Sequence, residues 1–277
     1  MLEFINWSME TKIGVVIVAS FFITAVIVGI TNVLGVRITP YDPLSQNVGS
    51  ALAPPSLSHL FGTDIVGRDV FSRIIVATPN DVGVGLVVVG VALFAGIVIG
   101  SSAAFKGGFL DEALMRFTDV IFALPALVIA MVIAVALGPG VTNMMVALLI
   151  IWWPPYARLA RGESLKVSHQ NYIEAARFSG TTTWKIIVGH VVPNIVSTIL
   201  IYATLDVGTV ILTYAGLSYL GLSVRPPVPD WGEMVSSYQD YLIVAPWLAI
   251  IPGLIIALVV VGFSLLGDGI KDAMESQ

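Results

Sequence analysis

The sequence predicts an all-α membrane protein with six transmembrane helices and a short cytoplasmic helix between spans four and five. Of the 277 residues, 57% are hydrophobic and only 11% are charged, whereas a soluble domain carries about 25% charged residues. Long charge-free runs recur along the chain, and a helix needs about 20 apolar residues to cross a bilayer. Strands of a membrane barrel would instead alternate apolar and polar residues over about ten positions.

The first two spans follow from charge-free runs near the N-terminus. No Asp, Glu, Lys or Arg lies between Lys12 and Arg37, which predicts a first span over residues 13–33. This run exceeds the about 7–15 residues of a signal-peptide core, and no small-residue cleavage site follows it, so we expect an uncleaved anchor. The next run, between Asp81 and Lys106, predicts the second span.

The other spans lie further along the chain. Residues 120–157 form the longest uncharged run, which is too long for one helix, and the Gly-Pro-Gly sequence at 138–140 predicts a turn near its middle. We therefore expect the four remaining spans at 120–137, 141–157, near 195–215 and within 241–267.

The basic residues orient these spans, because cytoplasmic loops carry an excess of Lys and Arg. With the N-terminus in the cytoplasm, nine basic residues face the cytoplasm and four face outside, and the reverse orientation exchanges these numbers. We therefore expect a multi-pass protein of the cytoplasmic membrane with both termini cytoplasmic. The nine are Lys12, Lys106, Arg116, Arg158, Arg161, Lys166, Arg177, Lys185 and Lys271, and the four are Arg37, Arg68, Arg73 and Arg225.

The spans and loops divide the chain into three parts. Residues 1–34 form an N-terminal segment with the first span, and 35–80 form an external loop. Residues 81–277 form a five-span core with a long cytoplasmic loop at about 158–194. The external loop is rich in Pro, Ser, Gly and Asp, which favour turns.

A second external segment, at 223–240, combines acidic with aromatic residues. It suits a docking platform at the membrane surface. For Trp231 and Tyr241 individually, an interfacial aromatic belt is the favoured interpretation, because Trp and Tyr gather at membrane–water interfaces.

The cytoplasmic loop is much longer than a connection between two helices needs. Within it, Asn171 and Glu174 have the spacing of a capping box, which predicts a short helix from Tyr172 to about Ser179. Gly180 then falls at the C′ position, where the left-handed backbone conformation favours glycine.

A second cytoplasmic helix is expected to begin near Trp184, after a run of threonines, and to lead to Pro193. Spacing alone supports a plain surface loop and a docking element about equally. A helix–turn–helix also occurs in DNA-binding proteins, but the net charge of −5 and the position between two spans argue against nucleic acid.

Several enzyme classes are excluded by missing motifs. The chain has no cysteine, which removes cysteine nucleophiles and thiolate metal sites. The histidines are scattered outside any His-Glu-x-x-His motif, and no phosphate-binding Gly-x-x-x-x-Gly-Lys loop occurs, so we expect no metal and no bound nucleotide. Two alternatives stay open. An intramembrane aspartyl protease needs two facing carboxylates, and an ion-coupled secondary transporter usually needs more spans and an inverted repeat.

The cytoplasmic loop resembles the EAA motif of binding-protein-dependent ABC importer permeases. The matching residues are Glu174-Ala175-Ala176, Gly180 and Val192-Pro193, and the stretch at 190–194 is similar to the His-x-Leu-Pro-Asn variant of the dipeptide/oligopeptide/nickel branch. Over residues 40–272, further segments resemble the second permease subunit of that branch, in family order. They are 61–73, 111–119, 153–158, 161–163 and 267–269.

The chain departs from this family pattern in two places. Residues 77–81 stand where the family usually has Gly-Ala-Arg-Ile-Ser. Residues 214–221 lack the acid of the family's Glu-Ala-Ser-Leu-Ser-Phe-Leu-Gly, while Asp206 stands two helical turns earlier. Because of these departures the sequence does not specify the substrate. They do not affect the resemblance to the class of importer permeases.

The resemblance implies a permease subunit, without enzyme activity of its own, that forms half of a pathway for a peptide-like or oligosaccharide-like solute. The implied partners are a second homologous permease subunit, two ATP-binding ATPase subunits, an extracytoplasmic substrate-binding protein and membrane lipid. ATP and Mg would bind to the ATPase subunits, and no cofactor is expected in this chain. ATP-driven motion would reach the spans through a cytoplasmic coupling helix. The coupling residues would be Glu174, Ala175, Ala176, Gly180 and Pro193.

Asp206 and Tyr214, in the fifth-span region, are candidate pathway residues. A carboxylate deep in a span costs on the order of 2.5–3.5 kcal/mol on insertion scales, so Asp206 should face protein or water. Contact with solute hydroxyl or ammonium groups is one interpretation. A hydrogen bond to Thr204, Thr209 or the partner permease is the other, and we weigh the two equally. The small-x-x-x-small pattern at 96–100 predicts helix packing.

Overall fold

A computed structural model describes residues 7–275 of the protein. Regular secondary structure in this range is helical, with one isolated β-bridge between Thr63 and Asp69. The long helices are α1 (Met9–Val33), α2 (Val70–Lys106), α3 (Gly108–Phe122), α4 (Ala126–Leu137), α5 (Val141–Ser168), α8 (Val192–Tyr219) and α10 (Trp247–Glu275). The short ones are η2 (Val48–Ser50), α6 (Asn171–Phe178), α7 (Thr183–Ile186), the π-helical η3 (Ile187–Val191), α9 (Trp231–Tyr238) and η4 (Gln239–Tyr241).

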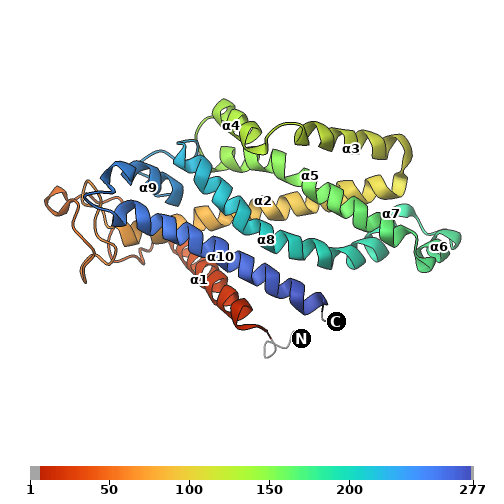
Figure 1. The fold of residues 1–277 in the computed structure, drawn as a ribbon, viewed down its shortest axis with the longest axis horizontal. Coiled ribbons are helices and arrows are strands. Elements are labelled where there is room, and N and C mark those ends of the chain that lie inside the picture. Colours follow the sequence, from red (N-terminus) through yellow and green to blue (C-terminus); the bar gives the residue numbers. More distant parts are fainter. Residues whose placement is uncertain (1–6, 276–277) are drawn as a thin grey trace.

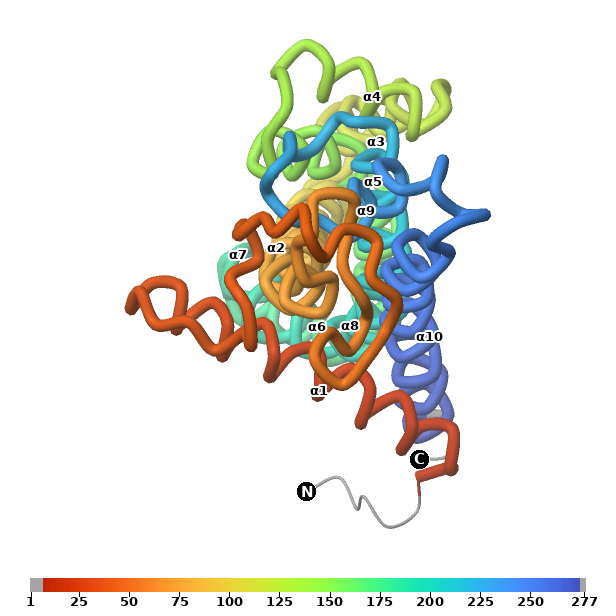
Figure 2. The backbone as a smooth tube through the Cα atoms, turned by 90° about the vertical axis from the view of Figure 1, so that its left-hand side faces the viewer, coloured from red at the N-terminus to blue at the C-terminus, as the bar shows by residue number. Residues whose placement is uncertain are grey.

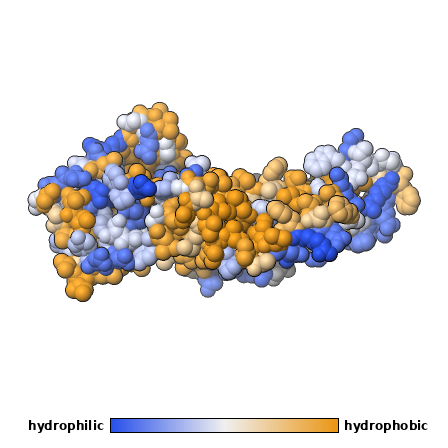
Figure 3. All heavy atoms as spheres, turned by 90° about the horizontal axis from the view of Figure 1, so that it is seen from above, coloured by the Kyte–Doolittle hydropathy of each residue, from blue (hydrophilic) through white to orange (hydrophobic). Residues whose placement is uncertain are grey.

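The long helices form an elongated bundle with the connecting segments gathered at its ends (Figure 1). The loop before α2 lies with α9 at one end, and α6 and α7 lie at the other. Seen from the end that carries the loop before α2, α1 and α4 lie on opposite sides of the bundle (Figure 2). Apolar side chains cover the middle of the molecule, and polar side chains increase toward both ends (Figure 3). This distribution is typical of a protein whose middle part lies in a membrane.

Four helical stretches in the described range are long and apolar enough to cross a membrane. A fifth is added if α3 and α4 count together as one bent span. The protein is therefore an all-helical, multi-pass membrane protein. The predicted number of six spans is larger than this count. The predicted span that is missing from it is α5, which carries Pro154, Pro155 and several basic residues. The four are Met9–Val33, Val70–Lys106, Thr183–Tyr219 and Trp247–Met274.

The predicted third span, 120–137, is not one helix, and this prediction is wrong. The chain leaves α3 after Phe122 and enters α4 at Ala126, with an angle of 84° between the two helices. Pro125 is the N-cap of α4 and its ψ is 121°. Proline disfavours the helical conformation in the residue before it and has no N–H to donate, so it ends α3 and starts a new direction. The turn predicted at 138–140 is confirmed between α4 and α5.

The second long helix begins well before the predicted boundary of the external loop at residue 80. Asp69 caps α2, and its carboxylate accepts a hydrogen bond from the N–H of Ser72 at 2.8 Å. Charge was the signal for placing the boundary, but Arg73 and Asp81 lie inside the helix and are both fully buried. Their partners come from distant segments, so a charged residue does not mark the start of this helix.

The helices α2 and α5 pack closely against each other at two glycines of α2. A side chain at Gly96 would lie 2.3 Å from Cβ of Tyr156, and one at Gly100 would lie 2.2 Å from the carbonyl oxygen of Ala157. Glycine at both positions lets the two backbones approach closely. The packing role predicted for the small-x-x-x-small pattern is therefore confirmed.

Candidate functional site

The predicted short helix in the loop between α5 and α8 is present as α6. Its predicted cap is wrong, because Gln170 is the N-cap and no side chain caps the helix. The carbonyl of Gln170 accepts hydrogen bonds from the N–H groups of Ile173 at 2.9 Å and Glu174 at 3.3 Å. Asn171 is already the first helical residue, so its side chain lies one position too late to act as a cap.

The end of α6 has the predicted glycine geometry. Gly180 has φ of +76°, a conformation that favours glycine. Its N–H donates to the carbonyl of Arg177 at 3.0 Å, and the N–H of Thr181 donates to the carbonyl of Ala176 at 3.1 Å. These two bonds make a Schellman motif, which satisfies carbonyls that the helix leaves free. A side chain added at Gly180 would meet no atom within 4 Å, so glycine is required by the backbone and not by space.

One face of α6 is anchored to the bundle. Ile173 is completely buried, and the guanidinium of Arg177 lies 5.3 Å from the ring centre of Phe105 at the end of α2. A cation over an aromatic face is attracted electrostatically to the ring. The other side of the loop is open: Phe178 is 91% exposed and Trp184 is 57% exposed. Large exposed aromatic side chains on an anchored helix are typical of a protein-docking surface.

The chain then runs from α7 through η3 into α8, as a single stretch that leads past Pro193. Proline lacks an N–H and crowds the carbonyl four residues earlier, and η3 is the local adjustment that precedes it. Asn194 donates through its side-chain amide to the carbonyl of His190 at 2.5 Å. Ile186 and Val191 are buried, so this segment connects α6 directly to a packed helix.

Asp206 lies near the middle of α8 and contacts α5. Its Oδ2 accepts hydrogen bonds from the indole N–H of Trp152 at 2.6 Å and from the hydroxyl of Tyr156 at 2.9 Å. Asp206 is half-buried, and the ring of Tyr202 packs edge-on against Tyr156 at 5.4 Å between centres. The hydrogen-bonding partners are therefore aromatic residues of α5 and not the threonines of its own helix. No pattern within α8 could have indicated them.

Tyr214, the second predicted pathway residue, is fully buried toward the end of α8. Its hydroxyl donates to Oδ2 of Asp230 at 2.7 Å and lies 2.7 Å from the hydroxyl of Ser223. Asp230 is the N-cap of α9 and accepts from the N–H of Glu233 at 3.0 Å. Tyr214 therefore joins α8 to α9. The sequence did not indicate Asp230 as its partner.

Trp231 begins α9 and is completely buried, so the interpretation as an interfacial aromatic residue is wrong for this position. Its indole N–H donates to the carbonyl of Ile74 at 3.2 Å, and its backbone N–H lies 3.3 Å from Oδ1 of Asp81. The ring of Phe21 packs edge-on against it at 5.8 Å. The tryptophan thus ties α9 to α2.

A buried polar network supports the same end of the bundle. Oδ2 of Asp64 accepts from Nε of Arg68 at 2.6 Å and from the hydroxyl of Tyr238 at 2.8 Å. Arg73 donates to the carbonyls of Pro43 and Pro227. Burial raises the pKa of Glu233, on α9, above its ordinary value. These hydrogen bonds join the loop before α2 to α9 and to the segment that precedes it.

Two ion pairs hold α3 against α5. Arg161 donates to both carboxylate oxygens of Asp111, from Nε at 2.6 Å and from Nη2 at 2.7 Å. Arg158 pairs with Asp119 and also contacts Thr118 through Nε at 3.2 Å. The acidic and basic segments that the sequence singled out separately therefore meet in space. A bidentate arginine–carboxylate pair fixes orientation as well as distance.

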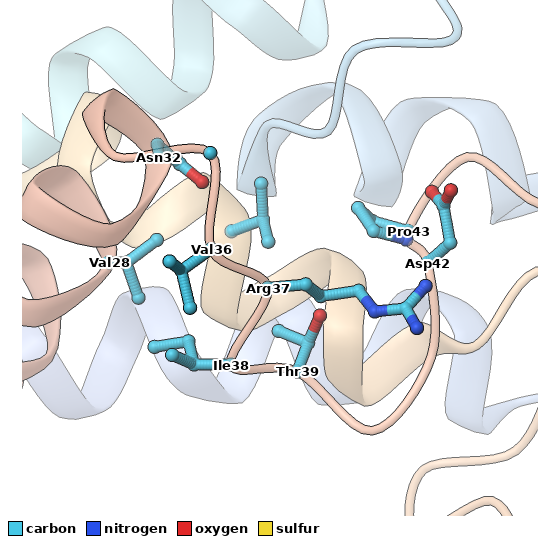
Figure 4. Close-up of a pocket in the computed structure, with 10 residues that line it drawn as sticks. Val28, Asn32, Val36, Arg37, Ile38, Thr39, Asp42 and Pro43 are labelled. Carbon is cyan, nitrogen blue, oxygen red and sulfur yellow. The ribbon is translucent and has the colours of Figure 1, made fainter.

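A pocket of about 230 Å³ opens between the end of α1 and the first residues of the loop before α2. In the close-up, Arg37 extends along the loop toward the segment with Asp42 and Pro43 (Figure 4). Val28 and Val36 line its apolar side. The pocket marks where the loop leaves α1, and its lining does not bring together a chemically reactive set of side chains.

The fold and these contacts define a multi-pass membrane protein with an anchored, exposed helical loop at one end and a polar residue inside a spanning helix. Residues 96–277 match the family model described as "Binding-protein-dependent transport system inner membrane component". The probable D,D-dipeptide transport system permease protein DdpC of Escherichia coli is 40% identical over 85% of this chain and 79% of its own length. The glutathione transport system permease protein GsiD of Pectobacterium atrosepticum is 39% identical over 85% of this chain and 76% of its own. The dipeptide transport system permease protein DppC of Alkalihalophilus pseudofirmus is 35% identical over 95% and 84%.

The chain belongs to the family of binding-protein-dependent transport system inner membrane components. It is a transmembrane permease subunit of an ABC importer of the dipeptide/oligopeptide family, as its sequence motifs predicted. Such permease subunits are not themselves enzymes, and a system of this kind works with ATPase and substrate-binding partners. Neither the intramembrane protease nor the secondary transporter is favoured.

Proposed function

We propose that this subunit forms half of the translocation pathway for a peptide-like solute. The other half comes from a second homologous permease subunit, and two ATPase subunits bind ATP and Mg. An extracytoplasmic binding protein delivers the solute. The substrate class is supported by the names of the relatives, which transport D,D-dipeptides, glutathione and dipeptides. An oligosaccharide-like solute is the alternative that the sequence leaves.

The structural observation behind the proposed coupling is the two-sided character of α6. Ile173 and Arg177 attach it to the bundle, while Tyr172 and Phe178 are exposed. A helix that is fixed on one side transmits a push from a partner instead of yielding to it. We propose that Glu174, Ala175 and Ala176, with Gly180 at the end, form the surface that an ATPase subunit contacts.

The proposed topology has six crossings and both termini in the cytoplasm, with α6 on the cytoplasmic side. The charge count supports it, and so does the separation of α6 from the loop before α2 at opposite ends of the bundle. In this arrangement α3–α4 form a bent crossing and α5 a further one. Pro193 lies where the loop enters α8, so it would transmit motion of the loop to that helix.

The test is Gly180→Val in the complete importer, reconstituted with its binding protein in lipid vesicles. A β-branched residue at φ of +76° costs on the order of 1–3 kcal/mol, and its Cβ meets no atom within 4 Å. Uptake of a labelled dipeptide should fall at least tenfold. Either the ATPase subunits dissociate or ATP hydrolysis continues without transport.

The matched control is Gly138→Val, because Gly138 has φ of +82° and also has no atom within 4 Å of an added side chain. It applies the same strain in the α4–α5 turn and should leave uptake within about twofold of wild type. Gly180→Asn should keep most of the wild-type uptake that Gly180→Val loses, since asparagine tolerates this conformation. Equal uptake in the two valine variants would remove the loop from the mechanism. Uptake of maltotriose but not of dipeptides would favour the oligosaccharide alternative.

A further inference from the structure

Asp206 differs from the acidic residues that pair with arginines and, like Asp230, it is bonded to neutral donors. Asp64, Asp111 and Glu233 each lie within 4 Å of an arginine, at distances of 2.6, 2.6 and 3.9 Å. The recorded partners of Asp206 are instead the neutral donors Trp152 and Tyr156. A half-buried carboxylate that has neutral donors and no cation attracts a cation from elsewhere.

Both neutral donors reach the same oxygen, Oδ2. Among the described residues, no donor forms a hydrogen bond to Oδ1. Some buried side-chain atoms lack both a partner and contact with solvent, and Oδ1 is not one of them. One oxygen is therefore fixed by the protein while the other is open. Two bonds to a single oxygen orient a carboxylate, which is how a binding group is held ready for a ligand.

Aromatic side chains of two helices lie close to Asp206. Trp152 and Tyr156 are one turn apart on α5, and Tyr202 and Asp206 are one turn apart on α8, so each pair shares a helix face. Tyr202 is 42% exposed and Tyr156 is buried beneath it. Aromatic faces attract ammonium groups, by about 0.5–2 kcal/mol depending on desolvation.

No basic residue of the two helices competes for this position. The sequence contains no Lys or Arg between Lys185 and Arg225, which covers all of α8. On α5 the nearest is Arg158, and its guanidinium pairs with Asp119 and lies 4.4 Å from the ring centre of Phe122. Among the described residues, no ion pair joins Asp206 to a basic side chain, so its negative charge is available to a cation that is not part of this subunit.

We propose that Asp206 and the aromatic side chains around it bind a primary ammonium group, such as the amino terminus of a peptide, during translocation. The site consists of Trp152, Tyr156, Tyr202 and Asp206. Oδ1 accepts an N–H of the ammonium group, the exposed ring of Tyr202 covers it, and Oδ2 stays bonded to the protein. The site rests on the proposed function, because the pathway is what would bring a solute to the middle of α8.

Cysteine chemistry gives a direct test, because this chain has no cysteine of its own. Thr209→Cys places a thiol on the exposed side of α8, one turn from Asp206. In the complete importer in lipid nanodiscs, its modification by the cationic methanethiosulfonate ethylammonium and by neutral methyl methanethiosulfonate is followed on this subunit by mass. The same ratio of rates is measured with Asp206→Asn, which keeps an acceptor oxygen for Trp152 and Tyr156 but loses the charge.

The cationic-to-neutral rate ratio should be about tenfold higher in the background that keeps Asp206 than in the Asp206→Asn background, since a nearby carboxylate concentrates cations. Ethylammonium chloride should slow the modification only when Asp206 is present, and sodium chloride at equal concentration should not. Leu57→Cys, in the external loop and 99% exposed, is the control position, with the same ratio in both backgrounds.

Three results would overturn the ammonium site without touching the proposed function. One is modification at position 209 with equal ratios in the two backgrounds, which would also follow if a cation of the second permease subunit neutralises Asp206. Another is equal protection by sodium and ethylammonium. Absence of any modification at position 209 in a complex that transports dipeptide would also overturn the site, because α8 would not face water there. Loss of dipeptide transport in the wild-type importer would instead count against the proposed function.

Discussion

The α2–α5 contact gives the sharpest stability prediction, through Gly100→Ala. An added Cβ at this position lies 2.2 Å from the carbonyl oxygen of Ala157 and 2.8 Å from the backbone nitrogen of Arg161. Both atoms belong to the backbone of α5, so no side-chain rotation can relieve the contact. The two helices must therefore move apart.

The size of the effect follows from a matched control in the same helix. Gly90→Ala adds the same methyl group to α2 where no atom lies within 4 Å. Both substitutions gain the same helix propensity, up to about 1 kcal/mol, so this gain cancels in the comparison. The remaining difference is the cost of overpacking, typically about 1–3 kcal/mol. Gly100→Ala should be the less stable variant by that amount.

The assay is thermal denaturation of the purified complex in detergent, followed by loss of the folded permease pair on size-exclusion chromatography. We expect the midpoint of Gly90→Ala at or above that of wild type and the midpoint of Gly100→Ala below it. Coincident midpoints for the two variants would show that the backbones of α2 and α5 are not in the close contact described here.

Two further outcomes are expected. In intact cells, Leu57→Cys should react with an impermeant thiol reagent added outside, whereas His169→Cys should react only after permeabilisation; the opposite pattern would reverse the proposed orientation. Asp111→Asn and Arg161→Gln should each destabilise the detergent-solubilised complex, by about 1–3 kcal/mol, and the double variant should cost clearly less than the sum; strict additivity would mean that the two side chains do not pair.

The sequence predicts the existence of the helices better than their limits. Long apolar runs correctly located α1, most of α8 and most of α10, because lipid-facing helices are predominantly apolar. The start of α2 was missed because Arg73 and Asp81 are buried among partners from the external loop and α9. The break after Phe122 was missed because Pro125 is as apolar as its neighbours and does not interrupt the run.

The local geometry of the candidate residues was predicted only where it depends on residues nearby in the sequence. Gly180 was identified correctly because a positive φ at a helix end depends on a single residue. The partners of Asp206 could not be identified, since Trp152 and Tyr156 are some fifty residues away and apolar runs carry no signal of pairing. Tyr214 reaches Asp230 in the same non-local way. Hydrogen bonds between spans depend on how the helices pack, which the sequence alone did not give.

The length of α2 connects the two ends of the molecule. Its 37 residues extend over about 55 Å at 1.5 Å per residue. Near one end Phe105 contacts Arg177 of α6, and near the other the carbonyl of Ile74 accepts the indole N–H of Trp231. Between them, α2 lies in close contact with α5 at Gly96 and Gly100. We therefore expect a displacement of α6 to pass along α2 to α9 and the loop before α2. This is the mechanical property that a subunit needs if ATP-driven motion on one side of a membrane is to change access on the other.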